Sequence, residues 1–162
     1  MREVKRKVLV IALAVAMLAL PISAAFATAP TTVITGTLTM IDPELYGEIR
    51  DLGNSGNQIW TFTDAPFEIT GDIEGYGVYN GKWIISLIDT FPYIEFVAAK
   101  GVYIMDVEVD GASGVLTLGL PNNGKVIVLG GTDGLKNLHG TGTLTPLSPL
   151  DYIVTINAHW DP

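Results

Sequence analysis

Residues 67–74 read FEITGDIE, and this stretch decides the fold class. Apolar Phe67, Ile69 and Ile73 alternate with polar residues, and Gly71 keeps the apolar phase. Alternation with a period of two is typical of a β-strand with one face in a core and one in water. We therefore expect a half-buried strand here, in an antiparallel sheet.

The chain after Pro30 continues this pattern in short runs separated by turn residues. Asn80-Gly81 and residues 121–124 predict hairpin turns, and a bend or bulge is expected near Lys100-Gly101. A loop at 42–57 is expected to hold one helical turn at 43–47. The strand at 67–74 is expected to continue through 76–79. The other expected strands are 33–41, 58–63, 82–88, 93–110, 114–120, 125–129, 138–145 and 152–160. Eight or nine strands suffice for a small closed barrel, so the sequence predicts an all-β fold with a single antiparallel eight-stranded barrel.

The first 27 residues predict a secretory signal peptide. Basic residues at positions 2 and 5–7 precede an apolar run at 8–20, and small residues then lead to Ala25-Phe26-Ala27. This order is typical of a cleavable export signal, and the apolar run is shorter than the ~20 residues that a membrane-spanning helix needs. We expect a mature domain at 28–162 that is secreted or extracytoplasmic, with no stable membrane insertion after cleavage.

The charge of the expected mature domain excludes several partners. The chain has 9 basic and 17 acidic residues, and removing residues 1–27 leaves 5 basic and 16 acidic residues, a net charge of −11. Such a domain is repelled by nucleic acid and by anionic lipid. The absence of cysteine excludes disulfides and thiolate chemistry.

The strand expected at 82–88 is apolar on both faces. If Ile84 and Ile88 face the core, then Trp83, Ile85 and Leu87 form an outer apolar row. Exposed apolar rows mark interfaces, so we expect a homo-oligomer.

Two groups of polar residues in the sequence are candidates for metal binding or acid–base chemistry. Residues 106–111 read DVEVDG and begin like a calcium loop, but position twelve is Thr117, and the valines favour a strand with an acidic face ending in an Asp-Gly turn. His139 and His159 are the two histidines, and His159 lies two residues before Asp161. Solvated or structural roles are favoured for both, and no metal site or cofactor is predicted.

Glu95 lies between Ile94 and Phe96. If it faces inward, a carboxylate with a raised pKa sits in an apolar barrel and can serve as an acid. If the phase is reversed, Glu95 is solvated, and the cost of burying a carboxylate favours this alternative.

Tyrosine and tryptophan are numerous for a small barrel, and an apolar ring with a polar tip suits a ligand cavity as well as plain core packing. Glycines, which leave space beside large rings, are expected in the lining at Gly71, Gly119, Gly140 and Gly142. The predicted ligand-binding residues are Trp60, Tyr76, Tyr93, Glu95, Tyr103 and His159.

Three stretches resemble, in order, an uncharacterised bacterial and archaeal domain family grouped with allene oxide cyclase and the dirigent proteins. They are FEITGDIEG at 67–75, VDGASG at 109–114 and GLKNLHGTGTL at 134–144. The resemblance implies an eight-stranded antiparallel barrel with an internal cavity. It also implies relatives that bind or cyclise small apolar molecules, several of them trimers.

These observations together favour an exported barrel that binds a small apolar molecule. Two alternatives stay open: an isomerase or cyclase that uses a barrel-lining carboxylate, and a non-catalytic structural surface protein with a solid barrel.

Overall fold

The computed structural model describes residues 31–161, apart from residues 54–55, 88–93, 123 and 149. The predicted signal peptide lies outside the described residues. Within them, no helix is both long and apolar enough to cross a membrane.

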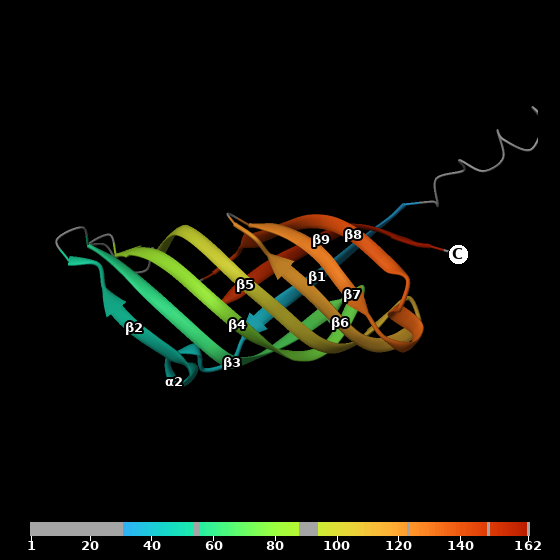
Figure 1. Ribbon diagram of the computed structural model, residues 1–162, viewed down its shortest axis with the longest axis horizontal. Coiled ribbons are helices and arrows are strands. Elements are labelled where there is room, and N and C mark those ends of the chain that lie inside the picture. Colours follow the sequence, from blue (N-terminus) through green and yellow to red (C-terminus); the bar gives the residue numbers. More distant parts are fainter. Residues whose placement is uncertain (1–30, 54–55, 88–93, 123, 149, 162) are drawn as a thin grey trace, which may run out of the picture. The chain divides into compact units, whose positions relative to one another are not determined.

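The described chain is almost entirely strand (Figure 1). A four-residue helix, α2 (Pro43–Tyr46), and a 3₁₀ turn, η2 (Asp133–Leu135), are its helical elements. The strands are β1 (Thr32–Met40), β2 (Gly47–Asp51), β3 (Asn57–Gly71), β4 (Ile73–Leu87), β5 (Ile94–Val109), β6 (Ala112–Leu120), β7 (Lys125–Gly131), β8 (Leu138–Pro146) and β9 (Asp151–Trp160). The predicted all-β class is confirmed.

Eight of these strands close into an antiparallel barrel. The strand order is β1-β9-β8-β7-β6-β5-β4-β3-β2, and a further pairing of β1 with β3 closes the ring. The closing ladder runs from Gly36 opposite Gly71 to Met40 opposite Phe67. The predicted eight-stranded barrel is therefore confirmed, with β2 as a ninth strand outside it.

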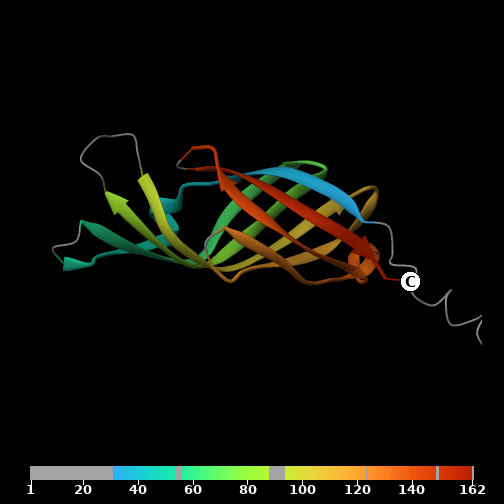
Figure 2. The same cartoon turned by 90° about the horizontal axis from the view of Figure 1, so that it is seen from above.

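Beyond the closed ring, β2 and one end each of β3, β4 and β5 form a sheet that we call the extension (Figures 1 and 2). It comprises β2 and residues 57–62, 81–87 and 94–100 of β3, β4 and β5. Here β3 pairs with β2 through residues 58–62, whereas its later residues 67–71 pair with β1. The long strands β3, β4 and β5 thus belong to both the barrel and the extension.

The core consists of the apolar residues of the predicted alternation. Phe67, Ile69 and Ile73 are fully buried, and Leu38 and Met40 of β1 are at most 1% exposed. Val107 and Val109 are buried while Asp106, Glu108 and Asp110 are exposed, which confirms a strand with an acidic outer face. The predicted Asp-Gly turn follows, since Asp110 and Gly111 both have positive φ. Every residue in the buried core of the described chain is hydrophobic.

The hairpin predicted at Asn80-Gly81 is wrong. Both residues lie inside β4, where Gly81 pairs with Gly101 of β5. Asn80 instead stabilises a β-bulge in β3 at Asp64, whose φ is +49°. The Asn80 side-chain oxygen accepts a hydrogen bond from the Asp64 backbone N–H, and the Asn80 amide nitrogen donates one to the Asp64 carboxylate. A bulge residue with positive φ needs such local support, and Asn80 provides it from the neighbouring strand.

The true turn between β3 and β4 lies at Gly71 and Asp72, inside the stretch predicted as one strand. Gly71 has a φ of +126°, and a Cβ there would lie 2.8 Å from the carbonyl oxygen of Thr35. The Asp72 carboxylate accepts a hydrogen bond from the Thr35 backbone N–H, and the Asp72 N–H donates to the Thr35 carbonyl. The turn is therefore held by β1.

One further expectation is corrected, because the loop predicted at 42–57 contains β2 besides its helical turn. The bend or bulge expected near Lys100-Gly101 lies a few residues earlier in β5, where the pairing with Ile84 and Ile85 skips one residue. The turn expected at 121–124 agrees with the bounds of β6 and β7.

The predicted outer row on β4 has the wrong phase. Trp83 and Ile85 are 4% and 1% exposed and belong to the core, while Ile84 is half-buried. The side chain of Leu87, and Ile88 altogether, lie outside the described residues. This row therefore does not support an oligomer interface.

Candidate functional site

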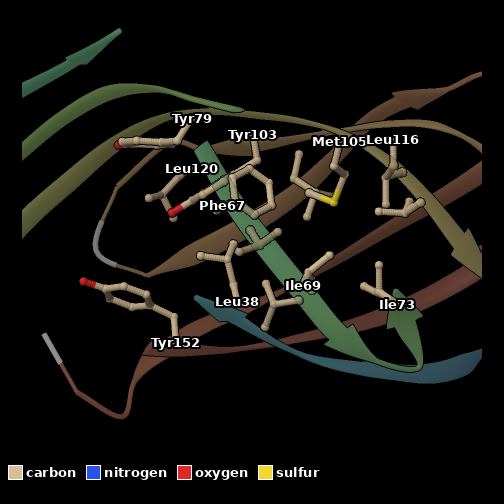
Figure 3. Close-up of a cluster of buried hydrophobic side chains, with 14 of the residues drawn as sticks. Leu38, Phe67, Ile69, Ile73, Tyr79, Tyr103, Met105, Leu116, Leu120 and Tyr152 are labelled. Carbon is tan, nitrogen blue, oxygen red and sulfur yellow. The ribbon is translucent and has the colours of Figure 1, made fainter. Parts of the chain in front are cut away.

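Six aromatic side chains gather at one end of the barrel core, where the extension begins. We call them the aromatic cluster: Phe62 and Phe67 of β3, Tyr79 and Trp83 of β4, Tyr103 of β5 and Tyr152 of β9. All six are at most 4% exposed. Figure 3 shows Tyr79, Tyr103, Phe67 and Tyr152 on one side of the core, with Ile69, Ile73, Met105 and Leu116 toward the other.

The rings of the aromatic cluster contact one another in tilted and edge-on arrangements. Phe62 and Trp83 have centroids 4.5 Å apart, and Tyr79 and Tyr103 are 4.6 Å apart. Phe67 meets Tyr103 edge-on at 5.3 Å, and Tyr152 lies 5.7 Å from Trp83. These spacings lie in the range that favours aromatic pairs. The result is an apolar environment with three phenol hydroxyls in it.

Tyr79 is held by two glycines and one hydrogen bond. Its ring covers the Gly81–Gly101 pair, because a Cβ at either glycine would overlap Tyr79 atoms. Its hydroxyl donates to the carbonyl of Lys100 at 3.0 Å. The space left by the two missing side chains is therefore filled by the Tyr79 ring.

Tyr103 differs because its hydroxyl has no hydrogen-bond partner in the described part of the chain. The residue is 1% exposed, and its buried Oη makes no hydrogen bond. An unsatisfied buried hydroxyl costs about 1–3 kcal/mol, and each such group in a folded protein calls for an explanation. A bound molecule that accepts a hydrogen bond from the Tyr103 hydroxyl would satisfy it, and this explanation implies a ligand-binding function.

The phenols of the aromatic cluster are protonated at neutral pH. Burial raises the pKa of Tyr103 well above its ordinary value of 10.0, with smaller contributions from Tyr79 and Tyr152. Burial likewise raises the pKa of Tyr79 and of Tyr152. The Tyr103 hydroxyl therefore offers a proton to an acceptor and does not act as a base.

The predicted ligand-binding residues fall in different places. Tyr103 belongs to the aromatic cluster, and half-buried Trp60 packs against the core and donates its indole N–H to Gln58. Tyr76 is 71% exposed on the outer face of β4, so it does not line the barrel. Tyr93 lies outside the described residues. Glu95 is placed by its backbone, which pairs with Ser86, but its side chain is not among those described.

His159 and Tyr152 lie near opposite ends of β9. It pairs across the ladder with His139 of β8, and the two rings stack at 5.8 Å. Their Nε2 atoms lie 3.5 Å and 3.4 Å from the two carboxylate oxygens of Asp161. All three side chains are more than a third exposed, and no group of three or more potential ligands in the described chain is arranged to hold a metal ion.

The glycines expected to open a cavity do not do so. A Cβ at Gly140 or Gly142 would meet backbone atoms of β9, and at Gly119 the side chain of Leu129. Gly71 is a turn residue. At Gly140 and Gly142 the missing side chains let neighbouring strands approach closely, and at Gly119 the space is occupied by the Leu129 side chain.

The sequence prediction missed Phe62, Phe67, Tyr79, Trp83 and Tyr152 as members of the site. Strand phase was a usable signal for β4, because Tyr79 and Trp83 share the odd-numbered phase of the buried Ile73 whereas Tyr76 does not. Strand phase was also usable for Tyr152, because it shares the even-numbered phase of the buried Val154 and Ile156 in β9.

No protein-family model and no curated protein matches the chain. Among solved structures, the chain is similar to a protein of unknown function from the DUF3224 family of Shewanella oneidensis MR-1. The TM-score is 0.50 at 15% sequence identity, and the match covers 82% of this chain and 99% of that one. A likeness at this identity shows the fold alone, because one fold hosts many functions.

Proposed function

We propose that this barrel binds one small, mostly apolar, uncharged molecule against the aromatic cluster, and that the Tyr103 hydroxyl donates a hydrogen bond to it. The observation that carries this proposal is the buried Tyr103 hydroxyl without a partner. A carbonyl, ester or ether oxygen on the ligand satisfies the hydroxyl, while the surrounding rings cover the apolar remainder.

The composition of the core supports binding over catalysis. In the described chain every buried core residue is hydrophobic, so the aromatic cluster contains no buried charged acid or base among these residues. The isomerase or cyclase alternative depends on Glu95, whose backbone pairs with half-buried Ser86. The resemblance to allene oxide cyclase and dirigent proteins agrees with an apolar ligand, and the kinship itself stays a prediction.

The proposed ligand is uncharged, and the proposed site is extracytoplasmic. Export rests on the order of charges and apolar residues in the first 27 positions. We expect the protein recovered from outside the cytoplasm to have the intact mass of a chain that begins at Thr28. A membrane-bound form that retains residues 1–20 contradicts this prediction.

Tyr103→Phe separates ligand binding from folding. Removing a hydroxyl that has no partner is expected to leave the free energy of unfolding unchanged or raise it, by up to about 1–3 kcal/mol. The same change is expected to weaken binding of a neutral carbonyl-containing dye, such as Nile red, about three- to tenfold. Dye fluorescence and quenching of tryptophan emission measure binding, and urea unfolding measures stability.

Tyr79→Phe is the matched control. It removes a phenol from the same cluster whose hydroxyl already donates to Lys100, so it is expected to cost about 1 kcal/mol of stability and to change dye affinity little. Equal effects of the two variants on affinity, or no saturable dye binding, contradict the proposal. A barrel that binds neither dye nor a neutral lipid extract supports the structural alternative.

A further inference from the structure

The outer edge of β2 is an unpaired sheet edge. In the described chain β2 ends the strand order, and its one strand partner is β3. Glu48, Ile49, Arg50 and Asp51 are all exposed, so no other segment covers them. A strand edge presents free N–H and C=O groups, which makes it a template for another strand.

We propose that β2 pairs antiparallel with β2 of a second copy of this chain, about a two-fold axis at Ile49. The two extensions then form one continuous sheet, and the assembly closes at two copies because both use the same surface. This inference is independent of the proposed ligand.

The charges of β2 fit this partner. Pairing centred on Ile49 sets Glu48 of one copy directly opposite Arg50 of the other, twice by symmetry. Opposite charges at directly opposed positions stabilise antiparallel pairs, and like charges destabilise them. Shifting the centre to residue 48 opposes two glutamates, and shifting it to residue 50 opposes two arginines. The sequence of this short strand therefore selects one register.

Neither charge has an ion-pair partner within its own described chain. Glu48 lies opposite Thr61 and Arg50 opposite Ile59 in the ladder with β3, and the ion pairs of the described residues are those of the two histidines. Glu48 and Arg50 lie two apart on one strand, so they share a face of the sheet. Their partners are supplied when a second β2 is added.

The apolar residues near this edge fit the same pairing. Ile49 is 48% exposed and lies opposite Trp60, which in turn lies opposite buried Trp83. In the dimer, Ile49 meets its own copy and extends this row. Leu45 and Tyr46 of α2, which leads directly into β2, are 78% and 44% exposed.

Five paired residues bury less than the ~1,200–2,000 Å² of a standard interface, so we expect a reversible dimer. Sedimentation velocity of the full-length purified protein from about 1 µM to about 1 mM is expected to show a monomer–dimer equilibrium. Raising the salt concentration is expected to weaken it, since exposed charge pairs are screened.

Charge reversal tests the register. Glu48→Arg and Arg50→Glu each replace two attractive pairs by two repulsive ones, and each is expected to weaken the dimer at least about tenfold. The double variant Glu48→Arg/Arg50→Glu restores opposite charges and is expected to recover dimerisation. Glu74→Arg, a reversal at an exposed glutamate of β4 outside the extension, is the control and is expected to leave the equilibrium unchanged.

Four results overturn the proposal. They are a monomer at every concentration, a dimer that the single reversals do not weaken, a double variant that stays monomeric, and a trimer or larger assembly. Far-UV circular dichroism of each variant shows that the barrel is folded, so a lost dimer is not a lost fold.

Discussion

Gly142→Ala is expected to lower the free energy of unfolding by about 3 kcal/mol or more. Gly142 lies in β8 opposite Ile156 of β9. A Cβ at this position would overlap the carbonyl oxygen of Thr155 and lie 2.9 Å from the Cα of Ile156. These are backbone atoms, so no side-chain rotation relieves the clash.

The closed barrel makes this clash costly. To make room, β9 has to move away from β8, but β9 is also paired with β1, which closes the ring against β3. Overpacking in a tightly packed interior costs about 1–3 kcal/mol when side chains can adjust, and more where backbone must shift. Urea unfolding followed by tryptophan fluorescence measures the loss.

Gly130→Ala provides the control on the neighbouring strand. Gly130 lies in β7, has no positive φ, and a Cβ there meets no atom within 4 Å. Its replacement is expected to leave stability within about 0.5 kcal/mol or to raise it slightly, because alanine has fewer unfolded conformations to lose. If both variants lose the same free energy of unfolding, then the close approach of β8 and β9 is not the reason that position 142 requires glycine.

The fold class was predictable because alternation survives in almost every strand. In β1 and at the start of β4 the buried residues keep one phase, and Asp110-Gly111 forms the turn that its sequence predicts. The Asn80-Gly81 prediction failed for a reason in tertiary structure. The local preference of Asn-Gly for a turn was outweighed by Asp64, which needs the Asn80 side chain across the ladder.

That single error also explains the wrong phase of Trp83. Without a turn at residues 80–81, β4 is one strand, and its odd-numbered residues from Ile73 through Tyr79 to Ile85 all face the core. A turn placed in the middle removed this continuity and left the phase of residues 82–88 open. Strand phase is reliable only within an unbroken strand.

The candidate site was predictable in kind and not in detail. The number of aromatic residues indicated a cluster with phenol hydroxyls, and Tyr103 was among the predicted residues. Its lack of a hydrogen-bond partner depends on which atoms of β3, β4 and β9 surround it, and no sequence pattern carries that information. The same holds for His139, which the β8–β9 register brings to the Asp161 carboxylate that His159 also contacts.

Phe67→Ala is expected to lower the free energy of unfolding by about 3–5 kcal/mol. Phe67 is fully buried, meets Tyr103 edge-on, and lies on the part of β3 that closes the barrel against Met40 of β1. Truncation removes the transfer free energy of the ring and leaves a cavity, because the closed barrel collapses only in part.

Tyr76→Ala is the control for Phe67→Ala, since it also removes a ring from a barrel strand. Tyr76 is 71% exposed on the outer face, so its loss is expected to change stability by less than about 0.5 kcal/mol. Urea unfolding compares the two variants.

The cavity left by Phe67→Ala lies beside Tyr103 and is lined by apolar groups. Such cavities take up small aromatic molecules, so saturating benzene is expected to raise the Tm of Phe67→Ala by more than that of Tyr76→Ala. A loss below about 1 kcal/mol for Phe67→Ala means that the core around this ring is already loosely packed. That outcome contradicts the packing described for β3 and indicates that space for a ligand is present at Phe67 before any side chain is removed.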